Sequence, residues 1–172
     1  MADGNASRCF LEDVVVLKIG ERELRASRQI LSRASPSFSS HFSRTRASTV
    51  EVTGVVYEEF RDLLHVIYCG KITDRMMPHL LKLAKDFEMT RVMELVEKHL
   101  IHSSRLKDLS RMTTADTYGL KNLRTHILNS FTHWRDLSKA LLPENREFSY
   151  TRDTMFAILR KNAYLYEAHP RK

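Results

Sequence analysis

The chain has 172 residues, of which 42% are hydrophobic and 28% charged, and it contains only five glycines and four prolines. This composition is ordinary for a globular protein and excludes collagenous and low-complexity classes. No run approaches the ~20 consecutive apolar residues of a membrane-spanning helix, and two cysteines are too few for a disulfide framework. We therefore expect a small folded protein in the cytoplasm or the nucleus, with no membrane association.

The net charge of +7 is concentrated in the C-terminal part of the chain. Residues 101–172 contain 13 lysines and arginines against 7 acidic residues, whereas the preceding residues are almost balanced. A basic surface attracts nucleic acids, anionic membranes or acidic proteins, although a solvated helix face gives the same pattern. The basic residues are scattered and no nucleic-acid motif accompanies them. If the excess charge has a partner, we expect an acidic protein rather than DNA or RNA.

The N-terminal part of the chain predicts a small sheet interleaved with helices. The β-branched run at residues 14–19 predicts a strand, and residues 23–26 predict the strand that returns after a turn at Gly20. Apolar residues at helical spacing predict a short helix over residues 28–34. Residues 49–52 predict a third strand.

A Ser-Pro pair separates this first helix from a second one. Proline is tolerated in the first turn of a helix, and Ser35 can cap the helix that Pro36 begins. Phe38 and Phe42 are four residues apart, so they lie side by side on one face of the second helix.

Amphipathic helices dominate the chain after the third strand. Residues 57–68 carry apolar side chains at i, i+3, i+4 and i+7, and Gly70 is suited to end that helix. Further helices are predicted, in chain order, over residues 77–87, 92–100 with Thr90 as a cap, 106–117, 121–132, 137–142 and 154–166. The fold class is therefore α+β, with a small three-stranded sheet and a helical cluster followed by an all-α C-terminal extension.

No pattern of catalytic or metal-binding residues is present. The chain lacks phosphate-binding loops, a nucleophile elbow and the paired histidines of zinc proteases. None of its eight histidines pairs at metal-ligand spacing with a cysteine or a carboxylate. We therefore predict a protein that is not an enzyme, with no catalytic residue, metal, cofactor or small-molecule substrate.

Three segments together resemble a BTB (POZ) domain. The sequences are DVVVLKIGERELRASRQILSRASPSFSSHF at residues 13–42, VVYEEFRDLL at residues 55–64 and LLKLAKDFEM at residues 80–89. The last two are especially similar to the BTB proteins that are greatly expanded in nematodes and often fused to a MATH domain. The resemblance implies the BTB/POZ fold and a protein–protein interaction function.

The C-terminal part of the chain is similar to the helical continuation of such proteins. The pattern Ala115-Asp116-x-Tyr118-x-Leu120-x-x-Leu123 matches the start of a BACK or 3-box region. The resemblance divides the chain into a flexible N-terminal segment (residues 1–11), a BTB/POZ domain (residues 12–102) and a BACK/3-box-like helical extension (residues 103–172).

The family resemblance implies a homodimer formed through the N-terminal segment and the first helix. It places Phe10, Leu11, Ile30, Leu31 and Ala34 at or near a two-fold interface. Ile30 and Leu31 also fit the core of the monomer. Phe10 points more directly to a dimer, because an aromatic residue ahead of the first strand is hard to bury without a partner.

A second implied surface is the one through which many relatives bind cullin-3 as substrate adaptors of ubiquitin ligases. In those relatives the loop after the second helix carries a hydrophobic-x-Glu motif. The equivalent surface here is Phe42, Ser43, Arg44 and Arg46, and residues 43–48 contain no acidic residue. Two functions remain open. The first is a homodimeric adaptor or scaffold for a cullin-3 ubiquitin ligase. The second is an oligomerisation or tethering module that is not linked to a ligase and that binds an acidic protein through its basic loop and tail.

Overall fold

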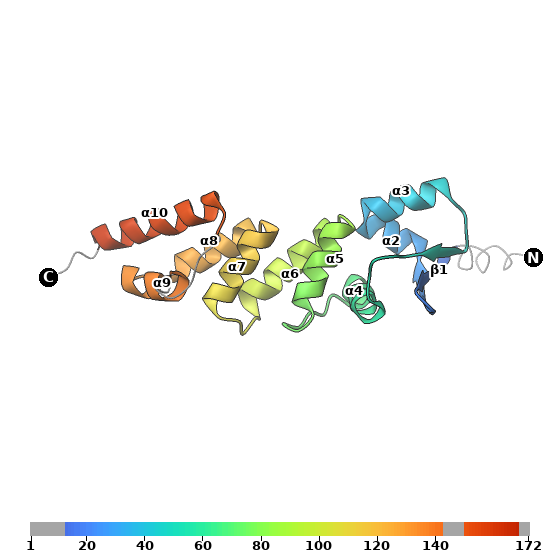
Figure 1. Ribbon diagram of the computed structural model, residues 1–172, viewed down its shortest axis with the longest axis horizontal. Helices are drawn as coiled ribbons and strands as arrows, with labels where there is room; N and C mark the ends of the chain where they lie inside the picture. The colour runs from blue at the N-terminus through green and yellow to red at the C-terminus, as the bar shows by residue number, and fades with distance from the viewer. Residues whose placement is uncertain (1–12, 143–149, 169–172) are drawn as a thin grey trace, which may run out of the picture. The chain divides into compact units, whose positions relative to one another are not determined.

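A computed structural model describes residues 13–142 and 150–168 of the chain (Figure 1). The chain divides into two compact units, an N-terminal unit (Met1–Val96) and a C-terminal unit (Glu97–Lys172), and the division falls inside helix α6 (Thr90–His102). Within the described ranges, no helix has both the length and the apolar character needed to cross a lipid bilayer.

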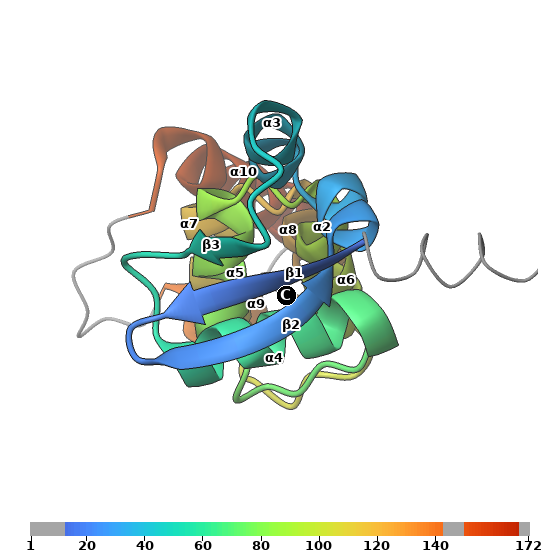
Figure 2. The same ribbon diagram turned by 90° about the vertical axis from the view of Figure 1, so that its right-hand side faces the viewer.

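The N-terminal unit contains a three-stranded sheet in the order β2-β1-β3 (Figure 2). Strands β1 (Val14–Ile19) and β2 (Arg22–Ser27) form an antiparallel hairpin, whereas β3 (Thr49–Glu51) runs parallel to β1 and pairs Val50 with Leu17. Alternate side chains of β1 are buried, as expected for a strand with one face on the core. The three predicted strands are therefore confirmed.

The helices of this unit follow the predicted order. They are α2 (Arg28–Ala34), α3 (Pro36–Arg44), α4 (Tyr57–Cys69), α5 (Met77–Asp86) and the first part of α6. Gly70 ends α4 in the left-handed conformation (φ 68°) that favours glycine. Thr90, which the sequence predicts as a cap, is instead the first helical residue of α6.

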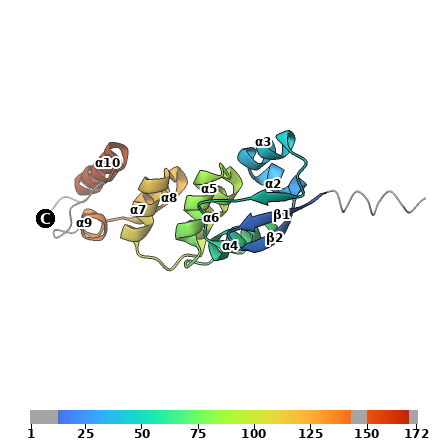
Figure 3. The same cartoon turned by 45° about the vertical axis from the view of Figure 1, so that its right-hand side comes forward.

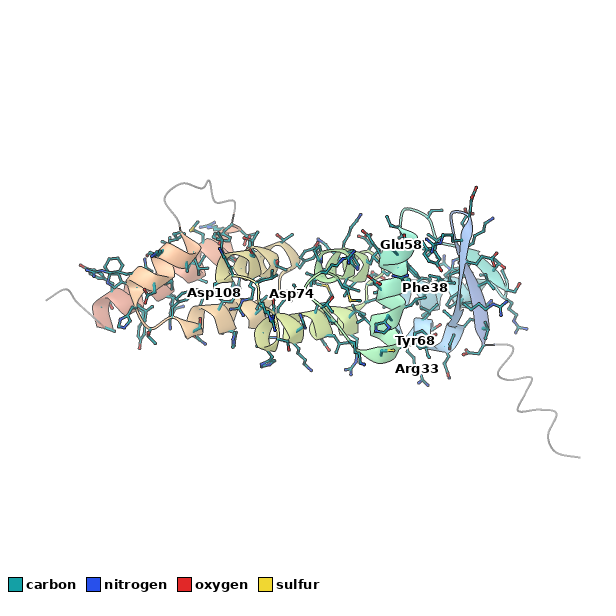
Figure 4. The ribbon with its side chains drawn as sticks, turned by 90° about the horizontal axis from the view of Figure 1, so that it is seen from below. Arg33, Phe38, Glu58, Tyr68, Asp74 and Asp108 are labelled. Carbon is teal, nitrogen blue, oxygen red and sulfur yellow. The ribbon has the colours of Figure 1, made fainter. Side chains whose placement is uncertain are left out.

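Helix α4 lies against β2 (Figure 3). Side-chain contacts near both of its ends hold it there. At its start, the Arg22 guanidinium lies 3.5 Å from the centroid of the Tyr57 ring and pairs with Glu58. The pKa of Glu58 is lowered by a hydrogen bond from its own backbone amide and then by the bond from Arg22. At the other end, the Ser27 amide donates to the Tyr68 hydroxyl at 2.8 Å. Figure 4 shows Glu58 and Tyr68 near opposite ends of α4.

The start of α3 is joined to the aromatic core of the N-terminal unit. The fully buried Ser35 hydroxyl accepts a hydrogen bond from the Phe38 amide at 3.1 Å and donates one to the Phe87 carbonyl at 2.6 Å. The Phe38 ring lies 5.2 Å from that of Phe87, 6.3 Å from that of Phe60 and 5.7 Å from that of Phe42. The predicted cap at Ser35 and the predicted Phe38–Phe42 pair are both confirmed.

The described part of the C-terminal unit is helical after α6. Its helices are α7 (Asp108–Tyr118), α8 (Lys121–Ser130), α9 (Trp134–Leu141) and α10 (Arg152–Ala168). Gly119 adopts a left-handed conformation (φ 68°) between α7 and α8, at the predicted turn. Helix α9 starts earlier than predicted and includes Trp134, whose ring packs 5.5 Å from that of Tyr166 on α10. The α+β fold with a helical extension is therefore confirmed.

A buried carboxylate caps α8 from outside that helix. Glu97 is only 9% exposed, and its two oxygens accept hydrogen bonds from the Leu123 amide at 2.9 Å and the Asn122 side chain at 3.0 Å. Leu120, which precedes the helix, makes no side-chain cap. The carboxylate of Glu97 therefore satisfies an amide in the first turn of α8 that would otherwise lack a helical partner.

Candidate protein-interaction surfaces

The N-terminus of α2 is organised by Asp13 and Ser27. The Ser27 hydroxyl accepts from the Ile30 amide at 3.1 Å and donates to the Asp13 carboxylate. The other Asp13 oxygen accepts from the Gln29 amide at 2.9 Å. Two amides of the first turn of α2 are thus capped, which fixes the direction of the helix that the family resemblance places at a dimer interface.

The predicted interface residues occupy different environments. Leu31 is completely buried in the N-terminal unit, so its side chain belongs to the core of the monomer. Ile30 and Ala34 are partly exposed and lie four residues apart on one face of α2. Phe10 and Leu11 lie outside the described residues. The dimer interface stays a prediction, and among its described residues only Ile30 and Ala34 have side chains exposed enough to contact a second copy.

Two exposed apolar residues, Val14 and Tyr68, adjoin Ser27, the residue that caps α2, and were missed from the sequence. Val14 pairs with Ser27 in the sheet, and Tyr68 accepts the hydrogen bond of the Ser27 amide. Val14 is 44% exposed and Tyr68 47%. We call Val14, Ile30, Ala34 and Tyr68 the α2 patch. Its members come from β1, α2 and α4, so no single segment of the sequence contains the pattern.

The surface predicted to correspond to the cullin-binding loop is partly helical. Ser43 and Arg44 belong to the last turn of α3, and the loop proper comprises residues 45–48. Phe42 is half-buried, and Ser43, Arg44 and Arg46 are exposed. The structure thus brings all four predicted residues together at the end of α3.

Arg28 holds this loop from the neighbouring helix. Its guanidinium donates to the carbonyls of Thr45 (3.4 Å) and Ala47, and its central carbon lies 5.0 Å from the centroid of the Phe42 ring. The Ser48 carbonyl accepts from the Val16 amide at 2.8 Å, which ties the end of the loop to β1. The charge of Arg28 is therefore directed at the loop backbone, whereas Arg44 and Arg46 face solvent and make the surface basic.

In the C-terminal unit, the segment similar to a BACK or 3-box region has a clear structural role. Ala115, Leu120 and Leu123 are buried, as the pattern requires of core residues. Asp116 accepts hydrogen bonds from the Thr151 amide (2.8 Å) and the Thr151 hydroxyl, immediately before α10 begins. The segment thus fixes the start of α10, although its assignment to a BACK or 3-box region stays a prediction.

The environment of Asp116 shifts its titration. Burial tends to raise the pKa of this carboxyl, but hydrogen bonds from Thr151 and Thr154, aided by the charge of Arg124, outweigh burial and lower the pKa below 3.8. Arg124 also donates to the Thr154 hydroxyl at 3.0 Å, so the network connects α7, α8 and α10. The ionised carboxylate is therefore favoured in the folded C-terminal unit.

Replacing Asp116 with asparagine is expected to lower the free energy of unfolding of the C-terminal unit by about 1–2 kcal/mol at pH 7. Because the pKa is lowered on folding, this stabilisation is present above the ordinary carboxyl pKa of 3.8 and disappears as the pH falls through the folded-state value. Urea unfolding at several pH values, followed by the fluorescence of the single tryptophan Trp134, measures the difference. A gap between wild type and variant that does not narrow as the pH falls from 7 to well below 3.8 would contradict this assignment.

The described residues do not form a group of three or more His, Cys, Asp or Glu side chains that could hold a metal ion. The described residues present a small sheet and helices with exposed apolar and basic side chains. A profile of the BTB/POZ domain matches residues 5–104, more than half of the sequence, and the chain therefore belongs to the BTB/POZ family. This family is defined by a protein–protein interaction fold and is not an enzyme family.

Two curated relatives come from Caenorhabditis elegans. BTB and MATH domain-containing protein 38 is 34% identical over 154 residues, which cover 86% of this chain and 39% of the relative. BTB and MATH domain-containing protein 36 is 29% identical over 163 residues, which cover 91% of this chain and 50% of the relative. The predicted similarity to the nematode MATH-BTB group is confirmed, and the chain spans half or less of the length of these relatives.

Solved BTB domains are also similar to part of the chain. The BTB domain of zebrafish PATZ1 has 30% sequence identity and a TM-score of 0.45, and the match covers 54% of this chain and 78% of that one. The BTB domain of human Gigaxonin has 19% identity and a TM-score of 0.44, and the match covers 53% of this chain and 81% of that one.

Proposed function

We propose that this protein homodimerises through the α2 patch and thereby pairs two copies of its C-terminal unit. The observation that carries the proposal is the grouping of Val14, Ile30 and Tyr68 around Ser27, where two of the three are more than 40% exposed. Apolar side chains that gather on one surface lose contact with water only when a partner covers them. A two-fold contact suits such a patch, because each copy presents the same surface to the other.

A single charge in the α2 patch tests the proposal. Light scattering should give a mass of twice the 20.1 kDa of one chain for the wild type, and the mass of one chain for Ile30→Asp at the same concentration. Burial of an unpaired carboxylate in an apolar contact is unfavourable enough to separate the copies.

Val56→Asp is the matched control, since Val56 is also apolar and exposed (53%). It immediately precedes α4, at the Ile19 end of the β1–β2 hairpin, whereas the α2 patch lies at the Val14 end. This variant should remain dimeric. A monomeric wild type, or a dimeric Ile30→Asp variant, would refute dimerisation through the patch.

For the partner of each dimer, two proposals compete, and the basic end of α3 favours an acidic protein. Arg44 and Arg46 are exposed, Arg28 is engaged with the loop backbone, and residues 43–48 include no carboxylate. A basic surface attracts an acidic partner. The same surface disfavours a partner that recognises a glutamate in this loop, because arginine reverses the charge at that position. The alternative is a substrate adaptor or scaffold of a cullin-3 ubiquitin ligase, which is what the family resemblance implies.

Titration calorimetry with the N-terminal region of cullin-3 separates the two proposals. We expect no binding at concentrations of tens of micromolar, which corresponds to a binding free energy weaker than about −6 kcal/mol. Saturable binding by the wild-type chain would instead support the adaptor function, and an Arg44→Glu/Arg46→Glu variant, which supplies carboxylates at the loop, should then bind at least as tightly. The double variant Arg75→Glu/Arg91→Glu makes the same change of charge at exposed positions outside the loop and serves as the control.

A further inference from the structure

The C-terminal unit contains a groove of about 370 Å³ between α8 and α10. Leu128 and its neighbours on α8 form one wall. Phe156, Ala157 and Tyr164 line the other wall from α10. Both walls are helices whose backbone groups are bonded internally, so the groove offers side chains rather than a free strand edge to a partner.

Two aromatic side chains on the α10 wall are largely exposed to solvent. Phe156 is 66% exposed and Tyr164 is 64% exposed. With Arg160 between them, they occupy i, i+4 and i+8, which places all three on one face of the helix. Single exposed apolar residues are ordinary on protein surfaces, but aligned aromatic residues along a groove are typical anchors of an interface.

The charges of the groove indicate the chemistry of its partner. Arg160 and Lys161 line its C-terminal half, and Asp153 is the acidic residue at its opposite end. Across the two described stretches of the chain, neither Arg160 nor Lys161 forms an ion pair, and the Lys161 ammonium instead lies 5.7 Å from the centroid of the Tyr164 ring. Two cations beside an apolar stripe complement carboxylates next to apolar side chains.

The length of the groove matches a helical partner. From Asp153 to Tyr164 the α10 wall extends about 17 Å, or three helical turns at 1.5 Å per residue. We propose that this groove binds an amphipathic helix of another protein, with its apolar stripe along Phe156 and Tyr164 and its carboxylates facing Arg160 and Lys161. This surface lies wholly within the C-terminal unit and does not depend on the α2 patch or on the loop at Arg44.

A library of helical peptides displayed on phage tests both the place and the chemistry of binding. The library is selected on the full 172-residue chain, and the enriched peptides are then measured by fluorescence anisotropy against purified variants. We expect enriched peptides to carry apolar residues at i, i+3 or i+4 and i+7 with Asp or Glu alongside. Their affinity should fall at least about tenfold for Phe156→Ser and for Arg160→Glu.

Leu159→Ser is the matched control, because Leu159 is 51% exposed on the same helix but does not line the groove. This variant should bind the peptides as the wild type does. All three substituted side chains are exposed, so unchanged thermal melting is expected of each protein.

Three outcomes would overturn the proposal. The first is enrichment of peptides with basic or uncharged flanks, and the second is affinity that does not change in Phe156→Ser. The third is a mass in light scattering that falls from dimer to monomer in Phe156→Ser, because a second copy of this chain would then occupy the groove.

Discussion

Replacement of Phe38 with alanine is expected to lower the free energy of unfolding of the N-terminal unit by about 3–5 kcal/mol, the usual cost of removing a buried phenylalanine ring. Phe38 is only 5% exposed, and its ring contacts those of Phe42, Phe60 and Phe87. The truncation would therefore leave a cavity between α3, α4 and the end of α5. Hydrogen exchange measured by mass spectrometry should show lost protection in β1 and α4.

The neighbouring ring supplies the control for this prediction. Phe42 stacks on Phe38 but is half-buried and covered on one side by the Arg28 guanidinium. Phe42→Ala should cost about 1–2 kcal/mol, in proportion to its smaller buried area, and loosen residues 45–48 more than the sheet. Equal losses of protection in the two variants would mean that Phe38 is not the centre of the aromatic core.

The elements of this fold could be predicted because each carries a local signal. The Ser35-Pro36 step indicates a helix start, the β-branched run of β1 indicates a strand, and Gly70 and Gly119 stand at helix ends with left-handed backbone. These signals depend on neighbouring residues and on backbone preference, so they are present in the sequence alone.

The surfaces could be predicted only in part, because they depend on long-range packing. Ile30 and Leu31 are adjacent and both apolar, yet one is partly exposed and the other lies in the core. Tyr68 joins the α2 patch only because α4 lies against β2. Its hydroxyl accepts a hydrogen bond from the Ser27 amide, although the two residues are 41 positions apart in the sequence. The groove at Phe156 likewise forms only because α8 and α10 are neighbours, and the spacing of residues within α10 does not predict which helix packs beside it.

Glu97 is the sharpest case of a residue whose role the sequence conceals. A glutamate within a predicted helix is ordinarily assigned to solvent, since ionised side chains are almost never fully buried without partners. Here its partners come from α8, 25 and 26 residues later in the chain. Only the packing of α8 on α6 within the C-terminal unit places the Leu123 amide where the carboxylate can accept it.

Substituting alanine for Glu97 should therefore destabilise the C-terminal unit by about 2–3 kcal/mol, since the Leu123 amide would be left buried without an acceptor for its proton. Leu123 itself is fully buried, so water cannot replace the lost carboxylate without entering the core. Urea unfolding followed by Trp134 fluorescence measures the change, because the only tryptophan of the chain belongs to this unit.

Two further variants separate the capping role of Glu97 from helix propensity and from charge. Glu94→Ala removes an exposed carboxylate from the same helix and should change the free energy of unfolding by less than about 0.5 kcal/mol. Glu97→Gln keeps one oxygen that can accept from the Leu123 amide but loses the charge, so its stability should fall between those of wild type and Glu97→Ala. If Glu97→Ala is no less stable than Glu94→Ala, then the first turn of α8 does not depend on this carboxylate, and Leu120 with the helices around it must position α8 by apolar packing alone.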